Sequence, residues 1–188
     1  MTRRVVVWCL YDWAYSAFTT IVVTFVFPTY FVRAVAPDPI SGTAAWAFAQ
    51  TVAGLVIAAI AAPLGALADA GGRRRALLGA FTTAMVVFTA ALWFVRPRAG
   101  DAMLALVLVA TATVAFETAT VFYNAMLPEI ACRRIGRVSG LAWASGYAGG
   151  LICLTLCLVV LISPDPPRFG LSRAAAEPVR AAALFAGA

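Results

Sequence analysis

Residues 44–68 read AAWAFAQTVAGLVIAAIAAPLGALA, twenty-five consecutive positions without a charged side chain. A helix needs about 20 mainly apolar residues to cross a hydrocarbon core of about 30 Å, because each residue adds about 1.5 Å of rise. Four further stretches are long and apolar enough to do the same, and they cover residues 5–32, 76–95, 102–127 and 138–162. The sequence therefore predicts an all-α membrane protein with five complete spans.

The overall composition fits a protein that has lipid as its main solvent. Hydrophobic residues make up 63% and charged residues 12% of the 188 positions, and the mean hydropathy is +0.93. An ordinary soluble domain has about 45–50% apolar and about 25% charged residues. This chain has too little polar surface to cover a globule in water. We expect a lipid bilayer as its principal partner.

The basic residues are all arginine, fourteen in number, and the formal net charge is +6. They interrupt the apolar runs rather than forming a basic patch, which argues against nucleic-acid binding. Eight of them fall on one predicted side of the membrane, at positions 3, 4, 73, 74, 75, 133, 134 and 137, against six on the other side. Because short cytoplasmic loops carry an excess of positive charge, we expect the N-terminus to lie in the cytoplasm. The membrane we expect is of the bacterial cytoplasmic type, that is, the cell inner membrane.

The small residues within the apolar runs are expected to serve helix packing. Gly146 and Gly150 have the small-x-x-x-small spacing that lets two membrane helices approach closely. The chain has four cysteines and no histidine, which is not a zinc or haem ligand set. Cys153 and Cys157 share a helix face and could act as a thiol pair, but packing is the interpretation we prefer. No cofactor and no metal site are expected.

The C-terminal part of the sequence changes character after residue 162. A polar segment is followed by a short apolar run over residues 181–188. Eight residues cannot span a bilayer. We expect this run to be the incomplete start of a sixth helix, which makes the chain a fragment of a longer protein. An interfacial or disordered tail is the alternative.

The sequence of the loop between the second and third predicted spans indicates which class of membrane protein this is. Residues 65–77 read GALADAGGRRRAL. This segment resembles the signature G-x-L-x-D-R-x-G-R-R-x-x-L of the major facilitator superfamily, with Ala70 where the family usually has a basic residue. The gating-loop residues that the resemblance implies are Gly65, Asp69, Gly72, Arg73 and Arg74. Glycine permits a tight reversal, and an aspartate here can accept hydrogen bonds from an arginine.

Three further segments resemble the vacuole-effluxer-like branch of that superfamily. They read LYDWAYSAF over residues 10–18, FYNAMLPEIA over 122–131 and GRVSG over 136–140. Eukaryotic members of the branch are vacuolar amino-acid exporters. The resemblance implies a secondary transporter of twelve helices in two halves, one of which rocks against the other around the solute. This chain corresponds to the first half, so the missing C-terminal half is an expected partner.

Polar side chains at helical spacing mark one face of the first span and one face of the fourth. The candidates for binding solute or protons are Asp12, Tyr15, Ser16, Glu117, Thr120 and Asn124. An ionised carboxylate near the bilayer centre costs about 2.5–3.5 kcal/mol on insertion scales, so such a group should face the bundle interior. In the resembled fold both helices border the central cavity, although Tyr15 stands where that branch usually has asparagine.

A different interpretation remains open for each carboxylate. Asp12 could lie at the interface and pair with an N-terminal arginine, and Glu117 could be protonated and hydrogen-bonded within the bundle. After the fourth span, a charged loop carries Glu129, Arg133 and Arg137. It resembles the family's counterpart of the gating loop, and we expect a cytoplasmic latch there. Solvated loop charges, each worth less than about 1 kcal/mol, are the alternative.

Transport of a small solute by alternating access is the function that these patterns predict. The solute could be an amino acid, moved by efflux and coupled to protons. One alternative is a truncated, inactive or structural membrane protein. Another is a membrane-embedded enzyme with Asp12 and Glu117 as an acid and base pair, but the sequence offers no histidine, nucleophile motif or phosphate loop for it.

Overall fold

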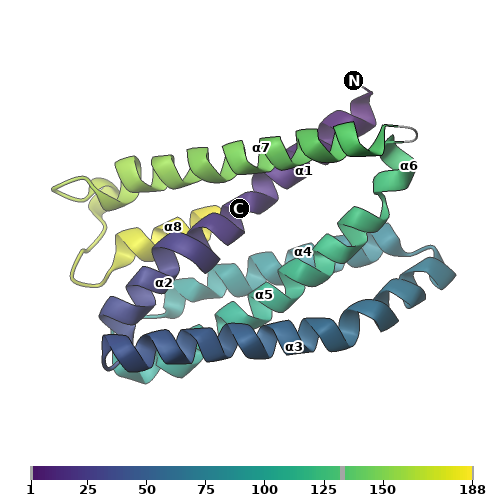
Figure 1. Ribbon diagram of the computed structural model, residues 1–188. Helices are drawn as coiled ribbons and strands as arrows, with labels where there is room; N and C mark the ends of the chain where they lie inside the picture. The colour runs from purple at the N-terminus through teal and green to yellow at the C-terminus, as the bar shows by residue number, and fades with distance from the viewer. Residues whose placement is uncertain (1, 132–133, 188) are drawn as a thin grey trace.

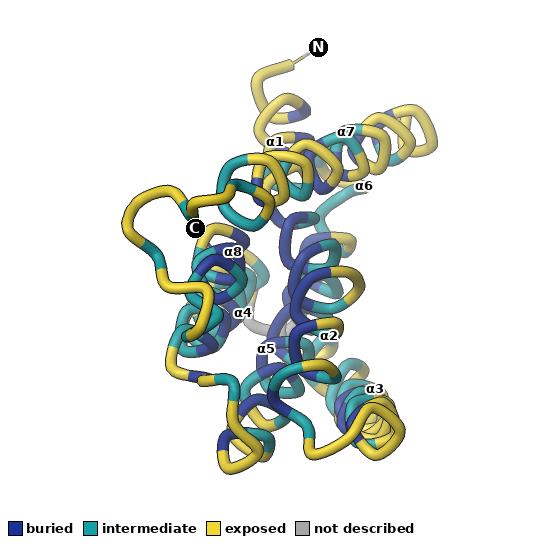
Figure 2. The backbone as a smooth tube through the Cα atoms, turned by 90° about the vertical axis from the view of Figure 1, so that its left-hand side faces the viewer, coloured by how far each residue is buried: buried dark blue, intermediate teal, exposed yellow. Residues whose placement is uncertain are grey.

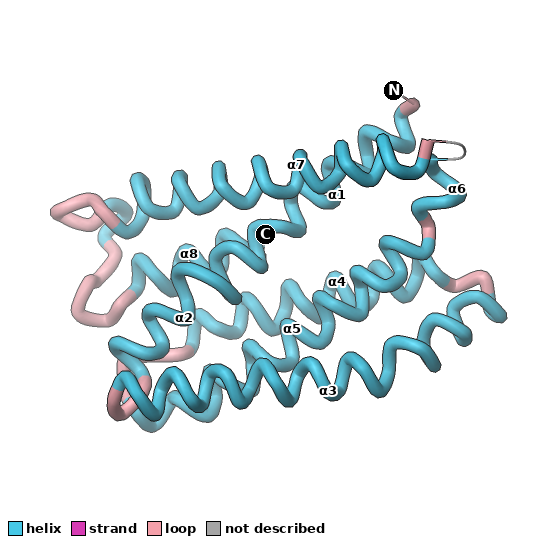
Figure 3. The backbone as a smooth tube through the Cα atoms, in the orientation of Figure 1, coloured by secondary structure: helices cyan, strands magenta, loops and turns pink. Residues whose placement is uncertain are grey.

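The computed structural model describes residues 2–131 and 134–187, and for residues 67–71 it describes the backbone only. Within this part of the chain the secondary structure is helical, without strands (Figure 3). The helical stretches that are long and apolar enough to cross a membrane are Arg3–Val35, Pro39–Ala66, Arg74–Phe94, Ala99–Ala131 and Ile135–Ile162. Even the shortest, with 21 residues, rises about 31 Å. The predicted all-α class with five spans is confirmed.

The first span is one continuous helical path that alternates between α and π geometry. α1 (Arg3–Ala17) is followed by the π-helical segment Phe18–Phe25, and α2 (Val26–Tyr30) by a second π-helical segment, Phe31–Val35. π-Helical turns are uncommon and often occur at functional sites. The first of them begins directly after the polar residues of α1.

The remaining helices lie within a few residues of the predicted runs. In chain order they are α3 (Pro39–Gly71), α4 (Arg74–Ala91), α5 (Ala102–Ala125), α6 (Leu127–Ala131), α7 (Ile135–Leu156) and α8 (Glu177–Gly187). Short 3-10 turns, Leu92–Phe94 and Ala99–Asp101, flank the connection from α4 to α5, and the π-helical segment Cys157–Ile162 extends α7. α8 begins earlier than the predicted position near residue 181.

The long helices run side by side and the loops gather at two opposite ends (Figure 1). α1 packs along α7, and α5 packs against both α3 and α4. α8 lies against α4 and the π-helical segments Phe18–Phe25 and Cys157–Ile162. The N-terminus, the α3–α4 turn and α6 lie at one end, and the connections before α3, α5 and α8 lie at the other (Figure 1). The two predicted groups of arginines therefore separate to opposite ends, as far as these residues are described.

The interior is aromatic and the exterior is apolar as well. Phe18, Phe27, Phe31 and Phe122 are almost completely buried. α3, in contrast, lies at the edge of the bundle with exposed residues along its length (Figure 2), among them Phe48 at 70% exposure. A large apolar exterior of this kind calls for lipid rather than water around it.

Glycines in α7 let this helix lie directly on α1. A Cβ atom added at Gly146 would lie 2.6 Å from the Ser16 hydroxyl oxygen, and one at Gly149 would lie 2.9 Å from Cγ of Trp13. Gly150 faces Thr20 at similarly close range. Small residues are what permit such an approach between membrane helices. The close helix contact predicted from the glycine spacing is present, and it brings α7 against the polar face of α1.

Candidate solute-binding cavity

A polar cavity of about 360 Å³ lies between α1, α5 and α7. Its lining consists of Asp12, Ser16, Thr19, Thr20, Phe116, Glu117, Thr120, Tyr123, Asn124, Trp143, Gly146 and Tyr147. Five of the six residues proposed from sequence for solute or proton binding line it, and Tyr15 does not. The helical spacings on two separate spans thus converge on one space.

The α1 side of the cavity presents hydroxyl groups whose protons are already engaged. The Ser16 hydroxyl donates to the Asp12 carbonyl at 2.8 Å, and the Thr20 hydroxyl donates to the Ser16 carbonyl at 2.9 Å. Thr19 donates to the same Ser16 carbonyl at 3.0 Å. Hydroxyls that bond back to their own helix in this way keep their oxygen lone pairs for the cavity.

The α5 side of the cavity also presents polar side chains from one helix face. Glu117, Thr120 and Asn124 are three and four residues apart, which places them on one face of the helix. The Thr120 hydroxyl donates to the Phe116 carbonyl at 3.1 Å. Apart from Asn124, whose amide has both donors and acceptors, this face offers acceptor oxygens.

The two carboxylates of the cavity have no protein partner in the described part of the chain. Asp12 and Glu117 are each half-buried, and no side-chain hydrogen bond or ion pair reaches either carboxylate from residues 2–131 or 134–187. Among these residues, Asp12 forms no ion pair with Arg3 or Arg4, and the Glu117 carboxylate forms no hydrogen bond to another part of the bundle. The contacts that the two alternative interpretations require are therefore absent among these residues.

Tyr15 forms part of the wall behind the cavity. Its ring stacks on Phe116 with centroids 4.1 Å apart, and its hydroxyl donates to the Phe116 carbonyl. The Thr120 hydroxyl lies 3.5 Å from the Tyr15 oxygen. The tyrosine is 7% exposed, so it positions α5 against α1. A second stacked pair, Trp8 and Tyr123, joins the same two helices at 3.5 Å.

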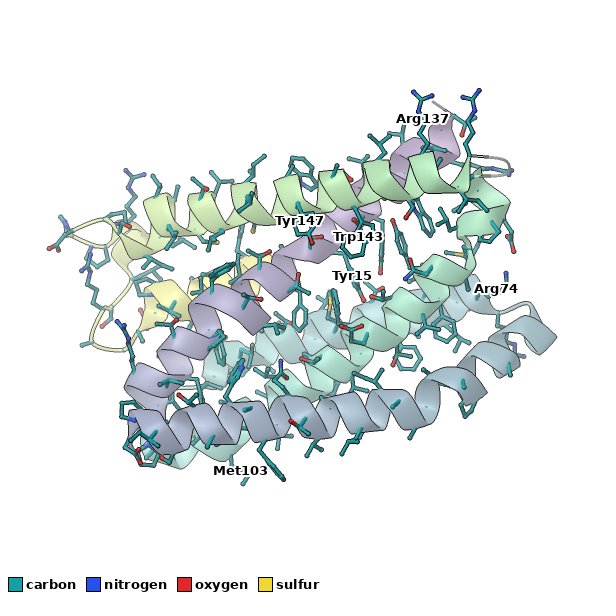
Figure 4. All side chains as sticks on the ribbon, in the orientation of Figure 1. Tyr15, Arg74, Met103, Arg137, Trp143 and Tyr147 are labelled. Atoms are coloured by element: carbon teal, nitrogen blue, oxygen red, sulfur yellow. The ribbon has the colours of Figure 1, made fainter. Side chains whose placement is uncertain are left out.

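Two aromatic residues of α7, Trp143 and Tyr147, complete the cavity and were not predicted from sequence. They lie on the α7 side of the space (Figure 4), and their ring centroids are 5.9 Å apart. The only available signal was their spacing around Gly146, at i, i+3 and i+4. That spacing shows a shared helix face but not which neighbour the face meets.

The predicted gating loop lies at the end of the bundle that carries the N-terminus. Gly72 has φ +59, a left-handed conformation that glycine adopts without cost. Arg73 is exposed, and Gly65 has open space around it. The side chain of Asp69 lies outside the described residues. Arg74, at the end of this loop, makes a long-range contact.

That contact involves Glu129, one of the predicted latch residues. Nη1 of Arg74 donates to Glu129 Oε1 at 2.8 Å and to the Ala125 carbonyl at 3.3 Å. Glu129 therefore pairs with an arginine fifty-five positions away. Arg137 lines a separate surface hollow with Val138 and Leu141, and Arg133 lies outside the described residues. The ion pair ties the start of α4 to α6.

Comparison with known proteins agrees with this architecture. The family model described as "Vacuole effluxer Atg22 like" matches residues 34–134. Over 174 residues the chain is 30% identical to YxiO of Bacillus subtilis (strain 168), an uncharacterized MFS-type transporter. The match covers 90% of this chain and 40% of YxiO, so the chain spans less than half the length of that relative. No solved structure matches the chain.

The fold and these matches define an integral membrane protein of the major facilitator type. More narrowly, the chain belongs to the vacuole effluxer Atg22-like family. The predicted membership in the vacuole-effluxer-like branch of the major facilitator superfamily is thereby confirmed.

Proposed function

We propose that this chain forms the N-terminal helix bundle of a secondary transporter that moves a small polar solute across a membrane by alternating access. The observation that carries the proposal is the polar cavity between α1, α5 and α7, set within a bundle whose exterior is apolar. A lining of this polarity has no role in packing against lipid. Binding of a polar solute during transport explains why these residues are polar.

The unpaired carboxylates support the same function. Asp12 and Glu117 lie in spans 33 residues long and have no described protein partner. A carboxylate inside a membrane protein is costly unless a proton, cation or polar ligand compensates it. We therefore assign solute or proton binding to the lining residues Asp12, Ser16, Glu117, Thr120 and Asn124.

The ion pair between Arg74 and Glu129 is proposed as a latch at the cytoplasmic end. It joins the gating loop to α6, which connects α5 with α7. The Glu129 side chain is 63% exposed, so the pair is weak and reversible. Such a contact suits a transporter that alternates between two states, because it can break without a large penalty.

An amino acid is the solute class that we propose first. The support is the resemblance of three segments to the branch whose eukaryotic members are vacuolar amino-acid exporters, and the family description as vacuole effluxers supports efflux. The similarity of the chain to YxiO, an MFS-type transporter, favours transport over catalysis by the Asp12 and Glu117 pair. Export across a cytoplasmic membrane, coupled to protons, is the direction and energy source that we propose.

The test uses the complete transporter that contains this chain, reconstituted in proteoliposomes with labelled amino acids. Glu117→Gln, which keeps the shape of the side chain, is expected to lower proton-driven transport at least tenfold while insertion is unchanged. Glu177→Gln, in α8 and away from the cavity, is the matched control and should retain wild-type rates. Wild-type transport by Glu117→Gln at every pH tested would remove Glu117 from the mechanism.

A further inference from the structure

The charged side chains that line the cavity between α1, α5 and α7 are all acidic. Two carboxylates line it, and none of its twelve lining residues is an arginine. The whole sequence contains no lysine and no histidine. A negatively charged solute entering this space would meet like charge without a compensating cation. The side of the transport path that this chain supplies therefore disfavours anions.

The hydroxyl groups of the lining also favour a ligand that donates hydrogen bonds. The hydroxyls of Ser16, Thr20 and Thr120 give their protons to carbonyls of their own helices, and the Tyr123 hydroxyl donates to the Trp8 carbonyl at 3.0 Å. Each of these oxygens then offers only lone pairs to a ligand. Together with the two carboxylates they give the lining more acceptor than donor groups, the donors being those of Asn124, Trp143 and Tyr147. A ligand rich in N–H donors satisfies such a lining.

Aromatic rings supply the third element. Trp143 and Tyr147 are 62% and 66% exposed and lie along one side of the cavity. The face of an aromatic ring attracts a cation, and tryptophan does so most strongly. Phe116 adds a third ring to the lining. Carboxylates and aromatic faces around one space form a typical receptor for an organic ammonium group.

We propose that this cavity recognises the ammonium group of its solute, so that the transporter selects organic amines and other ammonium-bearing solutes over anions. In this arrangement Asp12 and Glu117 accept two N–H bonds, the threonine and serine oxygens accept a third, and the ring faces of Trp143 and Tyr147 cover the ammonium group and the carbon next to it. An amino acid meets the requirement through its amino group alone. The inference rests on the proposed transport function and names its substrate class.

The test is a charge series of compounds that share one branched alkyl group. Tritiated isoamylamine, leucine and 4-methylpentanoate carry a positive, a zwitterionic and a negative charge, and 4-methylpentanamide is neutral. Equilibrium binding to the complete, detergent-purified transporter is expected to be at least tenfold tighter for the amine than for the anion or the neutral amide, with leucine between them. Equal or tighter binding of the anion or the amide overturns the proposal without any variant.

Variants then locate the binding to this cavity. Asp12→Asn and Glu117→Gln are each expected to weaken isoamylamine binding at least tenfold and to leave the weak binding of the amide unchanged. Asp38→Asn removes a carboxylate from a loop and should bind the amine like wild type. If both cavity variants elute as folded protein and still bind the amine with wild-type affinity, the assignment to this cavity is wrong.

The transport assay separates this inference from the function on which it rests. Amine-selective binding without movement of any solute in proteoliposomes contradicts the transport function and leaves the ammonium site intact. Transport of an anion in preference to the matching amine contradicts the ammonium site and leaves the transport function intact.

Discussion

The guanidinium group of Arg180 lies over the indole ring of Trp93, 4.6 Å from the ring centroid, and its Nε donates to the Trp93 carbonyl at 2.6 Å. Nη1 donates to the Ala175 carbonyl at 3.2 Å. The arginine is 7% exposed. It therefore fastens the start of α8 to the end of the third span, where carbonyl groups have no partner within their own helix.

Removing this arginine should loosen α8. We expect Arg180→Ala to lower the free energy of unfolding by about 2–4 kcal/mol, because charge-assisted hydrogen bonds and a cation–π contact are lost together. An SDS-unfolding titration followed by circular dichroism measures the change. Arg168→Ala is the matched control, since Arg168 is exposed in the connection that precedes α8. This variant should change stability by less than about 0.5 kcal/mol. Equal losses for both variants would show that the contact with Trp93 contributes nothing.

The surroundings of two glycines in α7 predict that the same substitution, glycine to alanine, has opposite effects on stability. A Cβ at Gly149 would press on the Trp13 backbone and ring, whereas a Cβ at Gly140 has nothing within 4 Å. Gly149→Ala is therefore expected to cost about 1–3 kcal/mol through overpacking. Gly140→Ala is expected to gain about 0.5–1 kcal/mol, because alanine favours helix. The same unfolding titration checks both, and a stabilising Gly149→Ala would contradict the close packing of α7 on α1.

Hydropathy was sufficient to predict the five spans, because each must supply about 20 apolar residues to cross the lipid core. Helical periodicity was sufficient to predict that Asp12 and Ser16 share a face, and likewise Glu117, Thr120 and Asn124. These features depend on local spacing alone. The convergence of the two faces on one cavity followed from the family resemblance rather than from spacing.

The features that sequence did not predict depend on how separate helices meet. Tyr15 lies only one position from Ser16, yet it packs behind the lining residue Phe116 and does not itself line the cavity. Trp143 and Tyr147 reach the cavity because Gly146 lets α7 approach α1. Glu129 was predicted as part of a charged latch loop, and its described partner, Arg74, comes from the start of α4. None of these contacts has a signature in local sequence.

The start of α3 should depend on pH through Asp38. Its Oδ1 accepts the backbone N–H groups of Ile40 and Ser41 at 3.0 and 2.9 Å, in the manner of an N-cap residue before a proline. The Ser41 hydroxyl, which donates to the other carboxylate oxygen at 2.5 Å, is the main reason that the pKa of Asp38 lies below its ordinary value, and the Ser41 backbone N–H adds to it.

A carboxylate whose pKa is lower in the folded than in the unfolded state stabilises the fold above the unfolded pKa, and this contribution is lost as the pH falls through the folded pKa. The first turn of α3 is therefore expected to fray below about pH 4, the range in which aspartate ordinarily titrates. Hydrogen exchange of residues 40–44, corrected for the intrinsic rate, measures this at pH 6 and pH 3. Asp38→Asn keeps an acceptor oxygen and should remove the difference. Equal protection of the wild-type turn at both pH values contradicts the cap.

The orientation that we propose places the arginine-rich end in the cytoplasm. Ala99 begins the 3-10 turn before α5, Gly136 lies in the first turn of α7, and both are exposed. The start of α5 and the start of α7 lie at opposite ends of the bundle (Figure 1), so single cysteines at these positions report the two sides. In a Cys132→Ser background, Ala99→Cys should react with an impermeant maleimide in intact cells. Gly136→Cys should react only after permeabilisation, because the positively charged loops are retained inside. The remaining native cysteines lie within helices, and the background alone measures their labelling. Labelling of Gly136→Cys but not Ala99→Cys in intact cells would reverse the topology and move the Arg74–Glu129 latch to the outer face.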